Sequence, residues 1–155
     1  MNSAFIKLRI GGIGLNLSEI TMTLNKEPTM SCKKGDKVVS KYKSEKTHHT
    51  EDIWLYDEEI LGEENHQERI NRFLDEFLHC TAYINKLLKD FEVMIWIAFY
   101  PETEQFSFHL DSEILKKITK LGVRLDVEVS YLQAFYDGTY KDRRHTAIGQ
   151  SNMKE

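Results

Sequence analysis

The strongest limit on the fold comes from regularly spaced apolar residues in the middle of the chain. Between residues 65 and 89 apolar side chains recur every three or four positions, at Ile70, Phe73, Leu74, Phe77, Leu78, Ile84 and Leu88. On an α-helix this spacing forms one continuous apolar face, which has to be buried against a second layer of structure. Asn65, followed three residues later by Glu68, resembles a capping box that begins such a helix. The sequence therefore predicts one long amphipathic helix that ends near Lys89.

Strand-like segments on both sides of this helix predict the layer against which it packs. Residues 6–10 alternate apolar and charged side chains, as a half-exposed strand does, and residues 123–131 repeat that alternation. Residues 93–100 form a continuous apolar run that suits a central strand. Shorter strands are predicted at 52–56 and at 106–110, the latter as the second arm of a hairpin.

Two more helices complete the predicted fold. Ser18 suits the N-cap of a short helix that Pro28 ends, and Asp111 begins a further helix that Gly122 ends. Together these elements predict an α+β two-layer sandwich. Its sheet is mostly antiparallel with about five strands, its helices pack on one face, and its topology is ferredoxin-like or related.

The length of 155 residues suits a single domain with its own core. We assign this α+β domain to residues 1–136 and expect a polar, mobile or loosely docked tail over 137–155. Cys32 and Cys80 form neither a disulfide framework nor a CxxC motif, which indicates a reducing compartment. The sequence contains no signal-like apolar run and no segment long enough to span a bilayer. We therefore expect a cytoplasmic protein without a membrane partner.

Charge is distributed unevenly along the chain, although the net charge is only −4. Residues 31–50 are rich in lysine and include a candidate edge strand at Val38 and Val39, whereas residues 51–68 are rich in acids and contain no Lys or Arg. Such a reversal can steer a charged partner, although two solvated loops of opposite sign would give the same pattern. Tyr42 is the one aromatic ring of Phe, Tyr or Trp in the basic stretch, so we do not expect a nucleic-acid partner.

The sequence contains no motif that predicts catalysis or a metal site. His79 and Cys80 are neighbours on the predicted helix, where adjacent side chains do not face each other. His48 and His49 lie near two acids but lack the recurrent spacing of metal ligands. We therefore expect no catalytic residue, no metal and no cofactor, and an enzyme is the third interpretation of the chain.

A glycine turn after the first strand offers one candidate site, because a turn between a strand and a helix can cradle a phosphate. The turn would be supplied by Gly12 and Gly14, and positive charge by Lys33, Lys34 and Lys37. A dinucleotide-binding fingerprint needs a third small residue where this chain has Leu17. This alternative is therefore a small-ligand or phosphate-binding module that uses residues 11–14.

Trp54 and the acids that follow it form the other candidate site. Trp54 is either a core anchor or an exposed binding aromatic. An acidic loop over 57–64 would mimic a polyanion or cover a basic site on another protein, and charge of this kind speeds encounter. The residues that we expect to contact a protein partner are Trp54, Asp57, Glu58, Glu59, Glu63 and Glu64.

The order of these landmarks resembles that of the DUF4279 family of bacterial and phage proteins. The residues that carry the resemblance are Arg9-Ile10, Glu27-Pro28-Thr29, Lys34-Gly35-Asp36, Trp54, Leu121-Gly122 and Leu125-Asp126-Val127. The resemblance implies no catalytic residue, because the family's function is unknown. By analogy with small acidic antagonists, we expect a non-enzymatic, immunity- or inhibitor-like protein that binds a partner with a basic surface. The sequence leaves the oligomeric state open.

Overall fold

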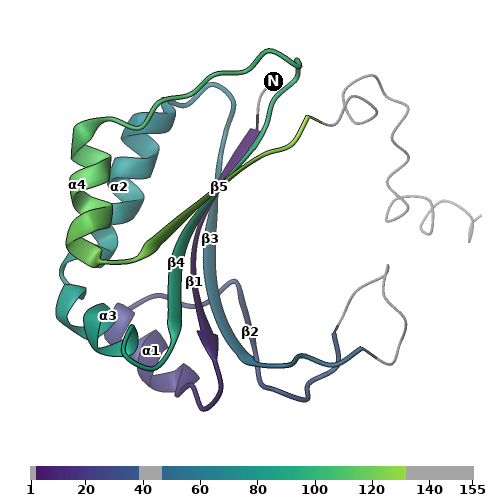
Figure 1. The fold of residues 1–155 in the computed structure, drawn as a ribbon, viewed down its shortest axis with the longest axis vertical. Helices are drawn as coiled ribbons and strands as arrows, with labels where there is room; N and C mark the ends of the chain where they lie inside the picture. Colours follow the sequence, from purple (N-terminus) through teal and green to yellow (C-terminus); the bar gives the residue numbers. More distant parts are fainter. Residues whose placement is uncertain (1–2, 39–46, 132–155) are drawn as a thin grey trace, which may run out of the picture.

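Within residues 3–38 and 47–131, which the computed structural model describes, five strands form one sheet and four helices cover one of its faces (Figure 1). In chain order the elements are β1 (Ser3–Gly12), α1 (Leu17–Leu24), β2 (Met30–Cys32), β3 (Asp52–Ile60), α2 (His66–Leu78), α3 (Thr81–Leu87), β4 (Glu92–Tyr100), α4 (Ser112–Leu121) and β5 (Arg124–Val129). The predicted α+β sandwich is confirmed.

The strand order is β2-β3-β1-β4-β5, with β1 at the centre of the sheet. β1 pairs antiparallel with β3 on one side and with β4 on the other, and β2 pairs antiparallel with β3. β4 and β5 are parallel, because the helix α4 carries the chain back before β5 begins. The sheet is therefore mostly antiparallel, with one parallel pair at its edge.

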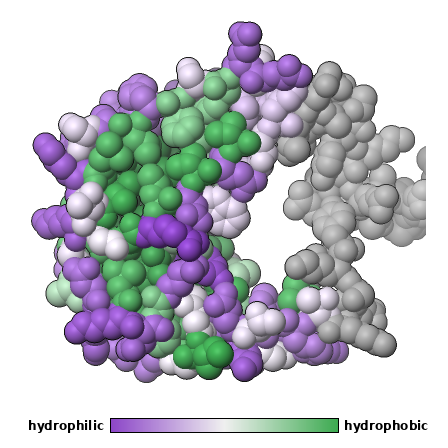
Figure 2. Space-filling model, in the orientation of Figure 1, coloured by the Kyte–Doolittle hydropathy of each residue, from purple (hydrophilic) through white to green (hydrophobic). Residues whose placement is uncertain are grey.

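The core lies between the sheet and the helices. Alternate residues of β1, from Ala4 to Ile10, are fully buried and meet the apolar side of α2, which includes Phe73 and Phe77. The residues of β1 that lie between these buried ones, Phe5, Lys7 and Arg9, point to the other face of the sheet and are half-buried. Where the two layers meet at β5, apolar side chains reach the surface (Figure 2).

The predicted long helix is wrong in one respect, because the structure divides it into α2 and α3. α2 ends at Leu78, and Asn65 caps its beginning as predicted, accepting the N–H groups of Gln67 and Glu68. The Thr81 hydroxyl donates to the Leu78 carbonyl at 2.6 Å, and this side-chain bond, which competes with the backbone bonds of a continuous helix, marks the break. Both helices keep their apolar sides on the sheet, which is why the spacing looked continuous.

The strand predicted at 106–110 does not form. Both edges of β4 are occupied, one by β1 and the other by β5, so no position remains for a hairpin partner. Phe106 and Phe108 instead stack their rings near Phe99, with centroids 5.3 and 4.6 Å away. The segment therefore closes the core at one end of the sheet.

Two smaller predictions also change, and a third concerns residues that the structure does not describe. Asn16, rather than Ser18, caps α1, since its side chain accepts the Glu19 N–H. The short edge strand beside β3 is β2, whereas Val38 belongs to no strand and Val39 lies outside the described residues. The domain boundary expected at 136 and the tail expected over 137–155 also lie outside them.

Gly122 ends α4 in the left-handed region, with φ of +73°, and its N–H group donates to two carbonyls of the last turn. A Cβ at this position would lie 3.1 Å from the Asn85 side-chain oxygen. We expect Gly122→Ala to lower the free energy of unfolding by roughly 1–2 kcal/mol, the cost of a left-handed non-glycine residue. Urea denaturation measures the change. Lys120→Ala on the same helix is the control, and an equal loss in both variants would contradict the prediction.

Candidate functional site

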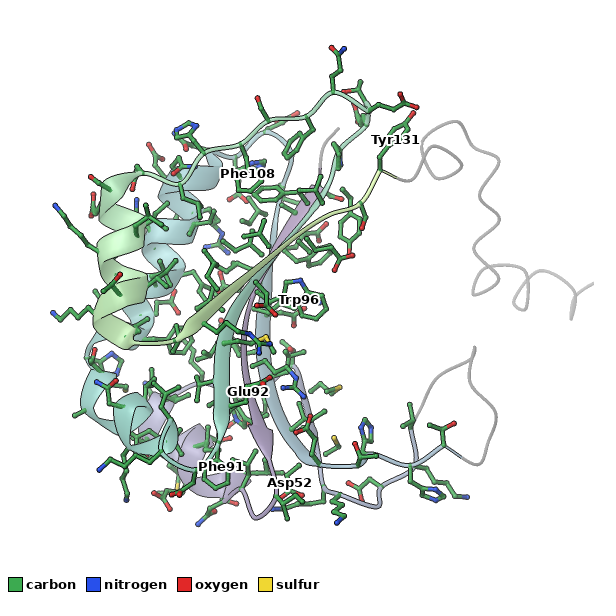
Figure 3. All side chains as sticks on the ribbon, in the orientation of Figure 1. Asp52, Phe91, Glu92, Trp96, Phe108 and Tyr131 are labelled. Carbon is green, nitrogen blue, oxygen red and sulfur yellow. The ribbon has the colours of Figure 1, made fainter. Side chains whose placement is uncertain are left out.

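The face of the sheet opposite the helices is covered by no helix of the described residues, and we call it the open face (Figures 1 and 3). Its side chains come from the alternate positions of the strands that do not point into the core. They include Phe5, Lys7, Arg9, Asp57, Glu59, Glu92, Trp96, Tyr100, Arg124, Asp126 and Glu128. Most of them are half-buried by their neighbours on the sheet.

One half of the open face is aromatic. The Lys7 ammonium lies 4.9 Å from the centroid of the Trp96 ring and 5.8 Å from that of Phe5. Phe5 meets Tyr100 edge to face at 6.1 Å. Attraction between a cation and an aromatic face contributes about 0.5–1 kcal/mol at exposed sites, so Lys7 holds these rings in place on the surface.

The other half of the open face is ionic. The Arg9 guanidinium bonds Glu51 and also Glu92, the latter at 3.3 Å. Arg124 bonds the same Glu92 at 3.2 Å and donates to Asp126 at 2.9 Å. These bonds connect β1, β4 and β5 across the sheet. Because several charges share partners, the network orders its side chains more than separate surface pairs would.

The first half of the predicted acidic loop, residues 57–60, is strand, because β3 continues to Ile60. β1 is long enough to pair with it throughout, and Phe5 and Lys7 lie opposite Glu59 and Asp57. Backbone pairing therefore outweighs the low strand propensity of the acids. Asp57 and Glu59 project onto the open face beside the aromatic half.

Glu58 lies on the helix side of β3, where it bonds Arg69 at 2.6 Å and accepts the Tyr56 hydroxyl at 2.6 Å. It is therefore engaged within the protein. Glu63 and Glu64 are exposed in the turn between β3 and α2, and Glu64 accepts the Leu61 N–H. Of the predicted acids, the structure brings together Asp57 and Glu59 on one face and leaves Glu63 and Glu64 at its end.

Trp54 is fully buried, so its expected role as a contact residue is wrong. It points from β3 into the core, and its indole N–H donates to the Thr21 hydroxyl of α1 at 3.0 Å. The core-anchor alternative is the one that the structure bears out. The alternation of β3 decides this, since residue 54 has the same parity as the buried residues of that strand.

Part of the glycine turn and two of the lysines of the alternative site do meet, but around Asp52, which is labelled in Figure 3. The carboxylate accepts the N–H groups of Gly14 and Leu15 at 2.9 Å and of Lys34 at 2.8 Å, and the Lys33 ammonium lies 3.4 Å away. The anion that these donors bind is therefore part of the chain itself.

Two residues of the alternative site do not join this cluster. Gly12 packs against Phe91, whose ring atom would lie 2.7 Å from a Cβ at that position. Lys37 forms an isolated β-bridge with His48. Of the residues proposed for this site, only Gly14, Lys33 and Lys34 supply donors to Asp52.

These bonds shift the ionisation of Asp52. The Lys34 N–H is the largest cause of a lowered pKa, and Gly14, Leu15 and Lys33 add to it, while burial acts in the opposite direction. The pKa falls from 3.8 to about 2. The carboxylate is thus ionised at neutral pH and ties the glycine turn to the segment that follows β2.

We expect Asp52→Asn to lower stability at neutral pH and to flatten its dependence on acid. A carboxyl group whose pKa is lowered by folding stabilises fully above its ordinary value of 3.8, and this stabilisation is lost as the pH falls toward about 2. Urea unfolding midpoints, measured at a series of pH values, test this. Asp57→Asn, on the same strand, is the control. Parallel pH curves for the wild type and Asp52→Asn would contradict the assignment.

The aromatic residues of the open face were missed by the sequence analysis. Residues 93–100 form an unbroken apolar run, which predicted a central strand and gave no sign of which residues face away from the core. The available signal was in β1: Lys7 and Arg9 must point away from the core, and any residue paired with them shares that face. Trp96 lies opposite Lys7 in the register, so its exposure depends on a pairing that the sequence does not state.

Taken together, the fold and the open face define a small two-layer α+β domain with one uncovered sheet face. The chain belongs to the DUF4279 family, since the model of this domain of unknown function matches residues 2–132. The resemblance read from the sequence is confirmed. No curated protein and no solved structure matches the chain.

Within residues 3–38 and 47–131 two features are absent, a metal-binding cluster and a membrane-spanning helix. No group of three or more His, Cys, Asp or Glu residues there is arranged to hold a metal ion. The described helices include none with the length and apolar character needed to cross a bilayer.

Proposed function

We propose that this domain is a non-enzymatic protein-binding module of the cytoplasm, immunity- or inhibitor-like, and that its contact surface is the open face. The observation that carries the proposal is an aromatic cluster on an uncovered sheet face, in which Lys7 lies against Phe5 and Trp96, and Tyr100 packs on Phe5. Trp and Tyr are the residues most often responsible for binding energy at protein interfaces.

The charge around this cluster points to a basic partner. Asp57 and Glu59 flank it on β3, and Asp126 and Glu128 flank it on β5. An acidic rim around an aromatic centre attracts positive charge during encounter and leaves the centre to supply affinity. We therefore expect the acids to raise the rate of association and the aromatic rings to lengthen the lifetime of the complex.

The first test is capture of partners by the immobilised protein from a lysate of the source organism, at low and at high salt. Mass spectrometry identifies a stoichiometric partner, and the affinity of this partner for purified variants of the domain is then measured. We expect Trp96→Ala to weaken binding by about tenfold or more, since loss of a central aromatic residue costs at least about 1.4 kcal/mol at a hot spot.

Met22→Ala is the matched control for Trp96→Ala, because Met22 is 80% exposed on α1, on the helix side of the protein. Circular dichroism and thermal melting confirm that both variants fold. If Trp96→Ala binds as tightly as the wild type, the open face is not the contact surface.

A separate prediction concerns the acidic rim. The double variant Asp57→Asn/Glu59→Gln is expected to associate more slowly at low salt and to show a weaker dependence of the association rate on salt, because steering by long-range charge is lost. Surface plasmon resonance measures both rates. Glu68→Gln, an exposed acid on α2, should leave them unchanged. Equal salt dependence in the wild type and the double variant would rule out an electrostatic role for the rim.

A further inference from the structure

β5 has an unpaired outer edge in the part of the chain that the structure describes. The Ser130 N–H donates to the Phe99 carbonyl at 2.9 Å, toward β4. Alternate residues of a strand turn their backbone groups to opposite sides, so those of Leu125, Val127 and Val129 face outward. A strand edge of this kind is a template for pairing with another strand.

Apolar side chains accompany this edge. Val127 is 39% exposed and Val129 is 47% exposed, on the side of the sheet that carries the helices. Leu115 of α4 and Phe108 lie on the same side of the molecule and are 47% and 37% exposed. Figure 2 shows apolar surface gathered where α4 and β5 lie. These residues are half of the large apolar side chains that the described residues expose.

The open-face side chains of β5 are ordered Arg124, Asp126, Glu128 along the strand. A second copy of β5 that runs in the opposite direction can therefore place its negative end beside the positive end of the first. When two β5 strands run antiparallel about a two-fold axis at Asp126, each Arg124 lies opposite Glu128 of the second copy. Leu125 then lies opposite Val127 of the second copy, and apolar residues meet apolar residues on the helix side.

We propose that this edge pairs with β5 of a second copy of the chain, in that register, so that the two sheets become one continuous sheet across a two-fold axis. The inference goes beyond the proposed function, because it uses the edge of the sheet and not its open face. It also places the open faces of the two copies side by side.

Neighbouring registers are less favourable. An axis at Val127 would set Asp126 against Glu128 twice, and like charges directly opposite each other are destabilising. An axis at Leu125 would set Arg124 opposite Asp126 twice, but it would pair only residues 124–126 of β5 and set Val129 against the end of α4, so fewer strand residues would be paired. At the proposed axis the two Asp126 carboxylates meet, but each is already bonded by Arg124 of its own chain at 2.9 Å.

The first experiment measures the mass of the full-length protein over a range of concentrations by light scattering and analytical ultracentrifugation. We expect a dimer. Glu128→Arg places two arginines opposite each other and should weaken dimerisation by about tenfold or more, as a close like-charge contact does. Glu68→Arg, which makes the same charge change on α2, should leave the dimer intact. Circular dichroism checks that both variants fold.

A second experiment tests the register directly. Because Leu125 and Val127 direct their backbone groups outward, Asp126 would form a non-hydrogen-bonded pair across the axis, with Cα atoms about 4.5 Å apart. This separation is within the range of a disulfide. In a Cys32→Ser background, Asp126→Cys should give a cross-linked dimer on oxidation with copper phenanthroline, and Glu113→Cys should not.

A monomer at every concentration would overturn the proposal, including a monomer whose β5 edge is occupied by residues 132–155 or by another protein. A dimer that tolerates Glu128→Arg and is not cross-linked through Asp126→Cys would overturn it as well. Loss of the dimer in Glu128→Arg, together with cross-linking at position 126, would support it.

Discussion

The structure depends on the pairing of β1 with a neighbour on each side. Every residue from Ala4 to Gly11 has a partner on β3 and another on β4. Because side chains alternate along a strand, this pairing sorts three strands at once into a face that contacts the helices and a face that does not. The core, the position of Trp54 and the composition of the open face all follow from that register.

Asp52 shows how the same sheet stabilises the irregular segments around it. Its carboxylate lies at the start of β3 and binds backbone N–H groups of the glycine turn and of Lys34. A motif of glycines before a helix with lysines nearby suggests an anion site, and the site does exist. Its anion is a side chain of the protein, which explains why the motif looks like a ligand-binding turn while acting as a structural one.

The two surfaces proposed for interaction are consequences of a helix layer that covers one side of the sheet. The open face retains aromatic residues that a second helix layer would have buried, and β5 retains an edge that a further strand would have paired. The rings around Lys7 suit affinity for another protein, and the charge order of β5 suits a second copy. The two surfaces are adjacent, so pairing at the edge would enlarge the face available to a partner.

Sequence alone determined the local features, because they depend on neighbours along the chain. The sequence predicted the alternation in β1, the Asn65 and Asp111 caps, the glycine end of α4 and the family. Tertiary structure decided the rest. The break between α2 and α3, the extension of β3 through the acids and the burial of Trp54 depend on partners distant in the sequence. So does the exposure of Trp96, since an apolar run looks the same whether one face of its strand is covered or both, and only the placement of the helices distinguishes the two.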